Sequence, residues 1–493
     1  MPTFLRRLLS RRTFTRLAFL VALVLTLLLV FIAFENWSGN RAWAAYCADA
    51  EKRGVPYQRT AFLPPAVPDA ENFAAIPLFQ EVFAASDAHQ PIPDPLKWNP
   101  PVPKSELPVL PNRLKGERMD FAKWQRALIA DHRLAEPTEN AARDLLTGLA
   151  GFEPALQQLR DAARRPSCHF PVRWEKGLMT AVPHLPLLQE AARLDAARML
   201  AHLALGDRQA ALADWRDGLA LYRALAHEPS LICGLVRIAN LRFIVDAMWQ
   251  GLAAHQWAEA DLRTIATDLG SLDLLADLRF ALGSERSGVN GVAEDLMRVS
   301  AGERAQLISL TQGPGTALNP GVQKAWQLYP SGWFRESQVK INELFDRRLA
   351  QIDPAHGRMI SLRSSDEELV GINHWGGLNR LRYILVMLLM PSLNSAEDSY
   401  AAAHTAVLQA RTACALELFR IAHGAFPERL EEMVPAMLET LPLDAMDGAP
   451  LRYRRTAEDG FVLWSIGLNR VDEGGKSDPD KNIRDQPDWV WHS

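Results

Sequence analysis

The sequence has little cysteine and lacks the short motifs that mark many enzymes. Only four of its 493 residues are cysteine, and no two follow the C-x-x-C spacing of a zinc or thioredoxin-like redox site. No H-E-x-x-H, Walker A, G-x-G-x-x-G or G-x-S-x-G run occurs. The usual signatures of zinc proteases, P-loop proteins, dinucleotide-binding domains and α/β-hydrolases are therefore missing. We predict no catalytic or cofactor-binding residue, and a non-enzymatic role is favoured over an enzyme.

The body of the chain also lacks an excess of positive charge. The formal net charge is −4, and residues 1–34 contain five arginines and no acidic residue, so the remainder carries −9 (−4 minus +5). Binding to the phosphate backbone requires a basic face, which argues against nucleic acid as a partner. Hydrophobic residues make up 48% and charged residues 23% of the chain, a balance typical of folded globular proteins.

One long apolar run is present near the N-terminus. It extends from Leu17 to Phe34 and is interrupted only by Thr26. At about 1.5 Å per residue, a helix of this length spans roughly 27 Å, close to the hydrocarbon thickness of a bilayer. We therefore predict a transmembrane helix over residues 17–34, preceded by a basic segment over residues 1–16.

The charges beside this run predict its orientation. All five arginines precede it and only Arg41 follows closely, so the positive-inside rule places the N-terminus in the cytoplasm. Trp37, Trp43 and Tyr46 then fall where an outer aromatic belt would lie. We expect a single-pass protein of the bacterial inner membrane with its body in the periplasm.

A cleaved export signal is the alternative to a permanent anchor. The stretch SRRTFTR over residues 10–16 resembles a twin-arginine signal, and Ala42-Trp43-Ala44 offers a signal peptidase site. However, the apolar run is longer than the roughly 7–15 residues usual for a signal peptide core. Its length favours a signal-anchor that is retained.

Proline marks the next region. Prolines dominate from about Val55 to Pro111, and because proline fixes φ and disfavours helix in the preceding residue, this stretch should be irregular. It also carries many large apolar side chains, which a free linker would not need. We predict a proline-rich, membrane-proximal segment over residues 35–120 that packs on the body and buries Phe62, Leu63, Phe73, Ile76, Leu78, Phe79, Phe83 and Trp98.

Helical periodicity dominates the middle of the chain. Apolar residues recur at steps of three and four between Leu187 and Ala204, and the pattern breaks at Gly206-Asp207 before it resumes. No 34-residue repeat is present, so a helical bundle or an irregular set of helical hairpins is predicted rather than a tetratricopeptide solenoid. We place a helical domain over residues 121–283 and a region of helices and loops over residues 284–394.

The last hundred residues change character. A helix to about His423 ends at Gly424, and two strand-like runs, LRYRR and FVLWSI, flank the turn signal Asp459-Gly460. Residues 395–493 are thus predicted to form a small α+β module with a β-hairpin. The whole chain is predicted to be mainly α, with an N-terminal transmembrane helix, a helical body and this C-terminal module.

An acidic loop, VDEGGKSDPD, follows the hairpin and admits two interpretations. It is either a solvated turn or a site for Ca²⁺, which takes six to eight oxygen ligands from a loop that curls around it. Gly474 and Gly475 permit the curl, and no EF-hand pattern occurs. On the second interpretation the ion would have a structural role, and its side-chain ligands would be Asn469, Asp472, Asp478 and Asp480.

The motif order at the C-terminus resembles a known family. The runs GAFPERLEEMVP, LPLDAMDGAPLRYRR and FVLWSIGLN, the acidic loop and DWVW together resemble the globular domain of type II secretion major pseudopilins, over roughly residues 395–493. The resemblance implies a β-hairpin and a calcium loop in which Asn469, Asp478 and Asp480 occupy ligand positions. The leader, the Gly-Phe-type cleavage site and the early glutamate of pseudopilins are missing, so the chain is not itself a pseudopilin subunit.

A second resemblance covers nearly the whole chain. With ENWSGNRAW, NFAAIPLF, SCHFPVRWEKG, GWF and DWVW in order, it looks like a family of membrane-anchored proteins from planctomycete and verrucomicrobial bacteria, which implies no particular activity. We expect a structural or interaction role with protein partners in the envelope, such as envelope assembly. The alternatives are an accessory component of a type II secretion or pilus-like system and an envelope hydrolase.

Two further features bear on those alternatives. Ser337–Lys340 reads S-x-x-K, as in penicillin-binding proteins, but no K-T-G element follows and chance explains the match. Four cysteines in an oxidising compartment permit two disulfides in three pairings, and no pairing follows from the sequence. Cys233 and Cys414 lie on apolar helical patterns that favour buried free thiols, whereas Cys47 and Cys168 do not.

Overall fold

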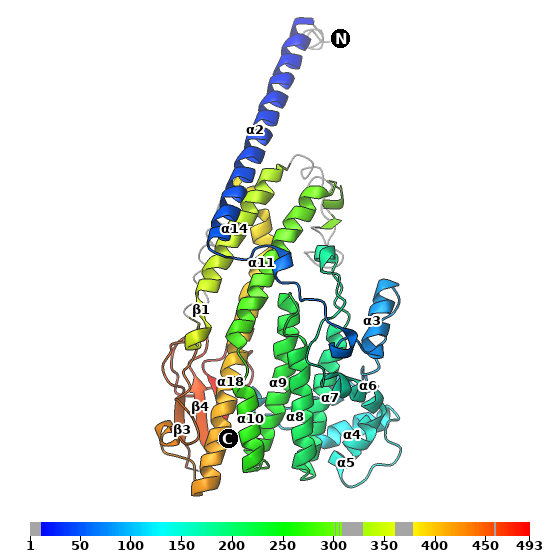
Figure 1. Ribbon diagram of the computed structural model, residues 1–493, viewed down its shortest axis with the longest axis vertical. Coiled ribbons are helices and arrows are strands. Elements are labelled where there is room, and N and C mark those ends of the chain that lie inside the picture. Colours follow the sequence, from blue (N-terminus) through cyan, green and yellow to red (C-terminus); the bar gives the residue numbers. More distant parts are fainter. Residues whose placement is uncertain (1–10, 301, 305, 308–328, 360–377, 458–459) are drawn as a thin grey trace, which may run out of the picture. The chain divides into compact units, whose positions relative to one another are not determined.

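The computed structural model describes residues 11–300, 302–304, 306–307, 329–359, 378–457 and 460–493, and it confirms a mainly helical chain with a small C-terminal sheet (Figure 1). The chain divides into two compact units. Unit 1 comprises Met1–Ala61, Arg286–Arg347 and Ser364–Ser392, and unit 2 comprises Phe62–Glu285, Arg348–Arg363 and Leu393–Ser493.

Unit 1 is built on one long N-terminal helix, α2 (Arg11–Lys52), of 42 residues. Its first half is long and apolar enough to cross a membrane, and its side chains there are largely exposed, Phe19 to 71% and Leu29 to 67%. The helix does not end where the apolar run ends. It continues into a segment whose Glu35 and Ala50 are buried within unit 1, so the predicted irregular segment begins only after Lys52.

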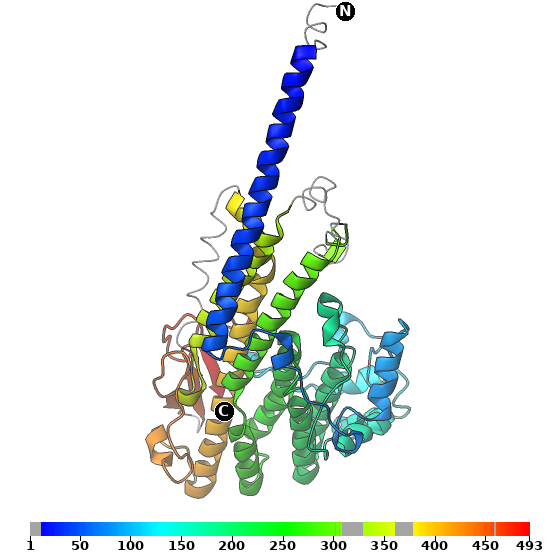
Figure 2. The ribbon, with the colours of Figure 1, turned by 45° about the horizontal axis from the view of Figure 1, so that its top comes forward.

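Two glycines allow α2 to cross α14 (Ser331–Ala350) at very short range (Figure 2). A Cβ atom added to Gly39 would lie 2.1 Å from the Gly332 carbonyl oxygen, and one added to Gly332 would lie 2.0 Å from the Glu35 carbonyl oxygen. Real Cβ atoms never approach backbone this closely. The crossing therefore requires glycine at both positions.

Polar contacts hold the same crossing. The Trp333 indole N–H donates to Glu35 Oε2 at 2.8 Å, and the Arg382 guanidinium donates to the same oxygen at 2.6 Å. Asn36 Oδ1 accepts from the Gly332 N–H at 2.9 Å at the start of α14. Because a buried carboxylate is costly unless it is paired and hydrogen-bonded, these donors are what allow Glu35 to be buried there.

The remaining helices of unit 1 join the same core. Asp346 on α14 accepts from Tyr46 of α2, from Arg53 just after the end of α2, and from Arg286, at 3.2, 2.9 and 2.8 Å. The other helical segments of unit 1 are the C-terminal part of α11 (Leu274–Arg298), α16 (Leu378–Arg382) and α17 (Ile384–Leu389).

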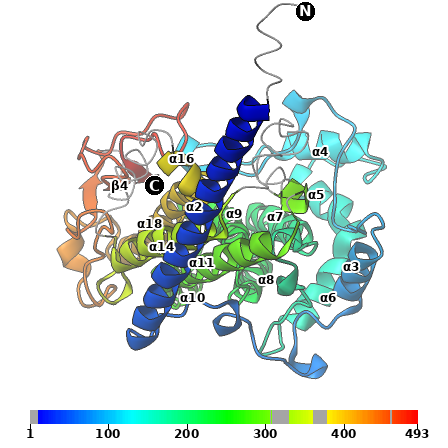
Figure 3. The same ribbon diagram turned by 90° about the horizontal axis from the view of Figure 1, so that it is seen from above.

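Unit 2 centres on three consecutive helices that pack on one another: α7 (Leu185–Ala204), α8 (Arg208–Ala224) and α9 (Leu231–Ala253). Gly206, with φ of +78°, makes the tight turn between α7 and α8, and the Asp207 side chain caps α8. Figure 3 shows α5 beside α7, with α4 next to α5. The other helices wholly within unit 2 are α3 (Pro77–Asp87), α4 (Phe121–Ala130), α5 (Ala141–Leu149), α6 (Glu153–Ala162) and α10 (Glu259–Gly270).

The proline-rich stretch within unit 2 is packed. Of the side chains predicted to be buried there, Leu63 alone is exposed, to 42%, while Phe62 and Phe83 are half-buried and the others are buried. The His184 ring lies stacked against Phe170, with a centroid distance of 4.0 Å.

Short 3-10 turns occur along the chain at Arg59–Ala61, Asp69–Glu71, Lys104–Glu106, Arg113–Lys115 (η4), Ala150–Phe152, Trp174–Met179, Pro354–His356 and Leu430–Met433.

The C-terminal part of unit 2 contains the sheet. The predicted hairpin is confirmed as β3 (Arg452–Arg455) and β4 (Phe461–Ser465), and β5 (Trp489–His492) adds an antiparallel third strand in the order β3-β4-β5. Strand β5 also contacts residues far away in sequence, because Arg113 of η4 donates to the Val490 carbonyl at 2.8 Å. The long helix α18 (Pro391–His423) and a two-stranded pair, β1 (Ile352–Asp353) and β2 (Arg358–Met359), complete the elements.

These units cut across the predicted domain boundaries. Residues 393–493 fall in the same compact unit as residues 62–285, and residues 284–394 are shared between the two units; the predicted domain boundaries themselves stay predictions. Residues 62–285 and 393–493 are joined by long-range pairing such as that of Arg113 with Val490, which no local pattern encodes. All four cysteines are free thiols in the described structure, and Cys233 and Cys414 are buried as predicted.

Candidate functional site

The acidic loop satisfies much of its hydrogen bonding within itself. Asn469 donates from Nδ2 to Glu473 at 2.7 Å and accepts from the Val471 N–H at 2.9 Å. Asp472 Oδ1 accepts from the Trp464 indole and from the Gly474 N–H, each at 2.9 Å. These hydrogen bonds, that from Trp464 foremost, lower the pKa of Asp472.

The other predicted ligands lie further along the loop. Asp478 Oδ1 accepts from the Asp480 N–H at 3.1 Å, and Lys481 lies 3.8 Å from the other Asp478 oxygen. Within residues 460–493, all of which the structure describes, Asp472, Asp478 and Asp480 do not form a group whose oxygens lie within 4.8 Å of one another. A calcium ion in this loop stays a prediction.

A carboxylate outside the predicted set of calcium ligands accepts hydrogen bonds from the loop backbone. Asp488, directly before β5, is completely buried. It accepts from the N–H groups of Gly475, Lys476 and Glu473 at 2.8, 3.1 and 3.4 Å. Three backbone donors on one carboxylate explain how this acidic side chain can be buried at the base of the loop.

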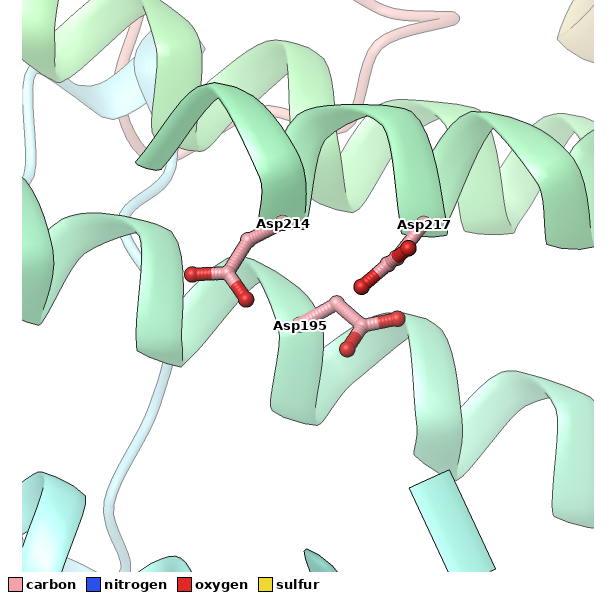
Figure 4. Close-up of side chains that lie close together, drawn as sticks. All are labelled: Asp195, Asp214 and Asp217. Atoms are coloured by element: carbon pink, nitrogen blue, oxygen red, sulfur yellow. The ribbon is translucent and has the colours of Figure 1, made fainter. Parts of the chain in front are cut away.

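Elsewhere in unit 2 the structure brings together three aspartates that sequence reasoning missed. Asp195 lies on α7, and Asp214 and Asp217 lie on α8 (Figure 4). Residues three apart share a face of a helix, so both α8 aspartates face α7 across the tight turn. Each of the three offers one oxygen within 4.8 Å of the others, and they are the one such acidic group among the described residues.

Two arginines approach the group from its sides. Arg198 of α7 donates from Nε to Asp214 Oδ1 at 3.0 Å, and Arg160 of α6 donates from Nε to Asp217 Oδ2 at 2.8 Å. Both guanidinium groups also donate hydrogen bonds to the Glu153 carboxylate at the start of α6. Four carboxylates therefore face two guanidinium groups, which leaves an excess of two negative charges if all are ionised.

Two carboxylate oxygens of the three aspartates lack a hydrogen-bond donor in the part of the chain that the structure describes. Asp195 is 3% exposed and Asp214 is 2% exposed, yet Asp195 Oδ1 and Asp214 Oδ2 have no hydrogen-bond partner among the described residues. Burial, followed by the charge of Asp214, raises the pKa of Asp195 well above its usual range. Burial likewise raises the pKa of Asp214 to about 7. His202 Nε2 lies 3.7 Å from Asp214 Oδ2, and burial lowers its pKa.

An open hollow of about 630 Å³ connects this group with solvent. Its charged lining consists of three aspartates, Asp214, Asp217 and Asp268, and five arginines, Arg160, Arg164, Arg198, Arg216 and Arg223. Because Asp217 is partly exposed there, with 23% of its side-chain surface accessible, water and small ions can reach the carboxylates.

A second, smaller cavity of about 220 Å³ lies between α9, α18 and η4 and is lined mainly by apolar side chains. Arg113 and Asp246 mark its polar end, with Arg113 Nε 3.6 Å from Asp246 Oδ1. Arg113 also lies over the Trp491 ring at 4.6 Å. These contacts join η4, α9 and β5, so this cavity is a feature of the packed core.

The serine of the S-x-x-K match is buried and hydrogen-bonded within the fold. Ser337 on α14 is completely buried, and its hydroxyl donates to the Arg382 carbonyl at 2.9 Å. The Lys340 ammonium lies 3.6 Å from Glu343. Neither contact presents a nucleophile to solvent.

A signal for the aspartate group was present in the sequence. Asp195 lies among small and apolar residues in the stretch ARLDAARML, which also contains Arg193 and Arg198, and Asp214 and Asp217 are spaced for one face of the next helix. In comparisons with known proteins, no protein family model, curated protein or solved structure matches the chain.

Proposed function

We propose that this chain is a single-pass, membrane-anchored protein of the bacterial inner membrane whose body lies in the periplasm and serves a structural or interaction role in the cell envelope. The observation that supports the proposal is the continuity of α2. The same helix is apolar and exposed over its first half and belongs to the core of unit 1 over its second half. A retained helix of this kind would hold unit 1 directly at the membrane surface.

Contacts beyond the apolar run argue for retention over cleavage. A cut after Ala44 would remove Gly39 and Glu35 from their packing against α14 and leave the buried Trp333 indole without its acceptor. It would also separate Trp43 from Tyr46, whose rings stack at 5.7 Å. An unpaired buried donor costs about 1–3 kcal/mol, so cleavage would destabilise the unit that it releases.

Charge supports the orientation and the type of role. Five arginines precede the apolar run and only Arg41 follows it closely, the asymmetry that the positive-inside rule associates with an exported body. The serine of the S-x-x-K match is buried and bonded to a backbone carbonyl, so it lends no support to a hydrolase.

An accessory role in a type II secretion or pilus-like system is the second candidate. It is supported by the C-terminal resemblance and by the antiparallel hairpin beside the long helix α18. Fold analogy alone is weak evidence of function. Crosslinking in native membranes, followed by identification of the linked proteins, separates an envelope assembly partner from a secretion component.

The anchor is tested on the full chain with a C-terminal tag, expressed in a bacterium and compared with Ala44→Leu, which blocks the signal peptidase site at an exposed helical position. Both proteins should have the same intact mass and resist extraction by alkaline carbonate. A soluble wild-type form that begins near Ala45, alongside an uncut Ala44→Leu protein, would contradict the anchor. Protection of the body from protease in intact spheroplasts would contradict the orientation.

A further inference from the structure

The buried aspartates of α7 and α8 raise a question that the membrane anchor does not answer. A carboxylate that loses water without gaining a donor is strongly disfavoured in its ionised form. Asp195 Oδ1 and Asp214 Oδ2 are in this situation, since no described residue donates to either. Something else must occupy the space between them, and the two simplest occupants are a proton and a cation.

The arrangement of the arginines favours a cation. Arg198 binds Asp214 through Oδ1, and Arg160 binds Asp217 through Oδ2. Each guanidinium thus fixes the orientation of one aspartate and leaves that aspartate's other oxygen without an arginine, and His202 Nε2 lies 3.7 Å from this oxygen of Asp214. Supporting groups that orient ligand carboxylates in this way are typical of metal sites.

The charge of the group points to a divalent ion. Asp195, Asp214, Asp217 and Glu153 contribute four negative charges, and Arg160 and Arg198 contribute two positive charges. A divalent cation would neutralise the two excess negative charges, as would two protons, one on Asp195 and one on Asp214; Arg164, Arg216 and Arg223, which line the same hollow, lie outside this count. Ligation by carboxylate oxygens alone favours a hard ion such as Mg²⁺, Mn²⁺ or Ca²⁺.

The hollow beside α8 supplies the route and the remaining ligands. It reaches Asp214 and Asp217 from solvent, so a hydrated ion can enter and keep part of its water shell. Hard divalent cations commonly retain several waters while two or three carboxylates bind them.

We propose that Asp195, Asp214 and Asp217 form a binding site for a hard divalent cation that cross-links helices α7 and α8 within unit 2. The site is distinct from the acidic loop over residues 469–480, and it does not depend on the membrane anchor. Its role is structural, because the ion joins the two sides of a helical hairpin whose facing carboxylates repel each other without it.

The test uses the full chain purified in detergent and stripped of metal with a chelator. Mn²⁺ is added, the free ion is followed by electron paramagnetic resonance, and Mg²⁺ and Ca²⁺ serve as competitors. We expect one tightly bound Mn²⁺ per chain and a rise in melting temperature. Asp195→Asn, which preserves shape and removes charge, should weaken this binding roughly tenfold or more.

Three further variants make the result decisive. Asp217→Asn, at the least buried of the three ligands, should weaken binding similarly and replaces Asp195→Asn if that protein does not fold. Glu259→Gln, which removes an exposed ion pair with Arg263, should bind as the wild type does. The double variant Asp478→Asn with Asp480→Asn should also retain the tightly bound ion.

Two outcomes would overturn the proposal. Loss of the bound Mn²⁺ in the loop variant but not in Asp195→Asn would place the ion in the C-terminal loop. Failure of wild-type protein to bind Mn²⁺ at millimolar concentration would leave protonation of Asp195 and Asp214 as the means by which the group is neutralised.

Discussion

In two acidic regions of unit 2, the carboxylates obtain their hydrogen-bond donors from different parts of the chain. In the C-terminal loop, backbone N–H groups serve the carboxylates: Asp488 accepts from three of them and Asp472 from one. In the α7–α8 hairpin, arginine side chains serve the outer oxygens, and Asp195 Oδ1 has no described partner.

Backbone geometry explains the difference. Inside a helix, each N–H beyond the first turn is used by the carbonyl four residues earlier, so none remains for a carboxylate on the helix surface. In an irregular loop the N–H groups are free and turn toward nearby acidic side chains. A dense acidic stretch is therefore not in itself a metal site, whereas a few aspartates on facing helices depend on arginine, a proton or a cation.

Removal of the loop's buried carboxylate should have the largest effect. Asp488→Ala leaves three backbone N–H groups without their acceptor and should lower the free energy of unfolding by about 3–5 kcal/mol. Guanidinium unfolding of the full chain, followed by tryptophan fluorescence, measures this change because Trp464 and Trp489 lie beside the loop. Asp485→Ala, an exposed acidic neighbour, is the control and should stay within about 0.5 kcal/mol. A similar loss in both variants would contradict the role given to Asp488.

Cation binding in the hairpin should have the next largest effect. Free Mn²⁺ at a hundredfold excess over its dissociation constant should stabilise the wild type by about 2.7 kcal/mol, and this gain should vanish in Asp195→Asn. The measurement is the unfolding midpoint with Mn²⁺ and with chelator. An equal gain in both proteins would show that the hairpin is not the site.

The two regions should also respond to pH with opposite signs. Burial raises the pKa of Asp214 to about 7, so without metal the folded protein holds a proton that the unfolded chain releases above roughly pH 4. Metal-free stability should therefore fall as pH rises from 5 to 7, by about 2 kcal/mol for this group. Asp214→Asn should flatten that slope.

For the loop the sign is reversed. The pKa of Asp472 is lowered, so its contribution is present above the unfolded value and is lost as pH falls below roughly 4. Asp472→Asn should affect only that acidic limb. The two limbs are separated by unfolding the protein across pH 3–8 in chelator, and a single slope common to both variants would show that the two regions are not distinct.

The smallest effect is expected at the tip of the loop. Asp478→Ala with Asp480→Ala should change stability by less than about 0.5 kcal/mol in chelator, because Asp480 is exposed and the Asp478 side chain keeps 40% of its surface accessible. With calcium added, a solvated turn predicts the same small value, and we expect this outcome from the way the loop satisfies itself. A calcium-dependent gain that the double variant removes would instead establish the loop as a calcium site.

Local sequence patterns predicted many of the helices and strands. The apolar run of residues 17–34, the helices on either side of Gly206-Asp207 and the hairpin around Asp459-Gly460 were all predicted, and helices and strands occur there in the described structure. Each depends on neighbours a few residues apart, which a single sequence displays directly.

The aspartate site was not predicted, although its residues were visible. Asp195 lies in a helix rich in apolar residues, but the sequence does not show which helix its face meets. The sequence by itself determined that the chain is mainly helical, acidic over its body and able to cross a membrane once near its N-terminus, because composition and periodicity are local properties. Only the tertiary structure decided that α2 continues into unit 1, that β5 pairs with β4, and that Asp195 faces Asp214 and Asp217, because these contacts join residues whose proximity depends on how whole elements pack.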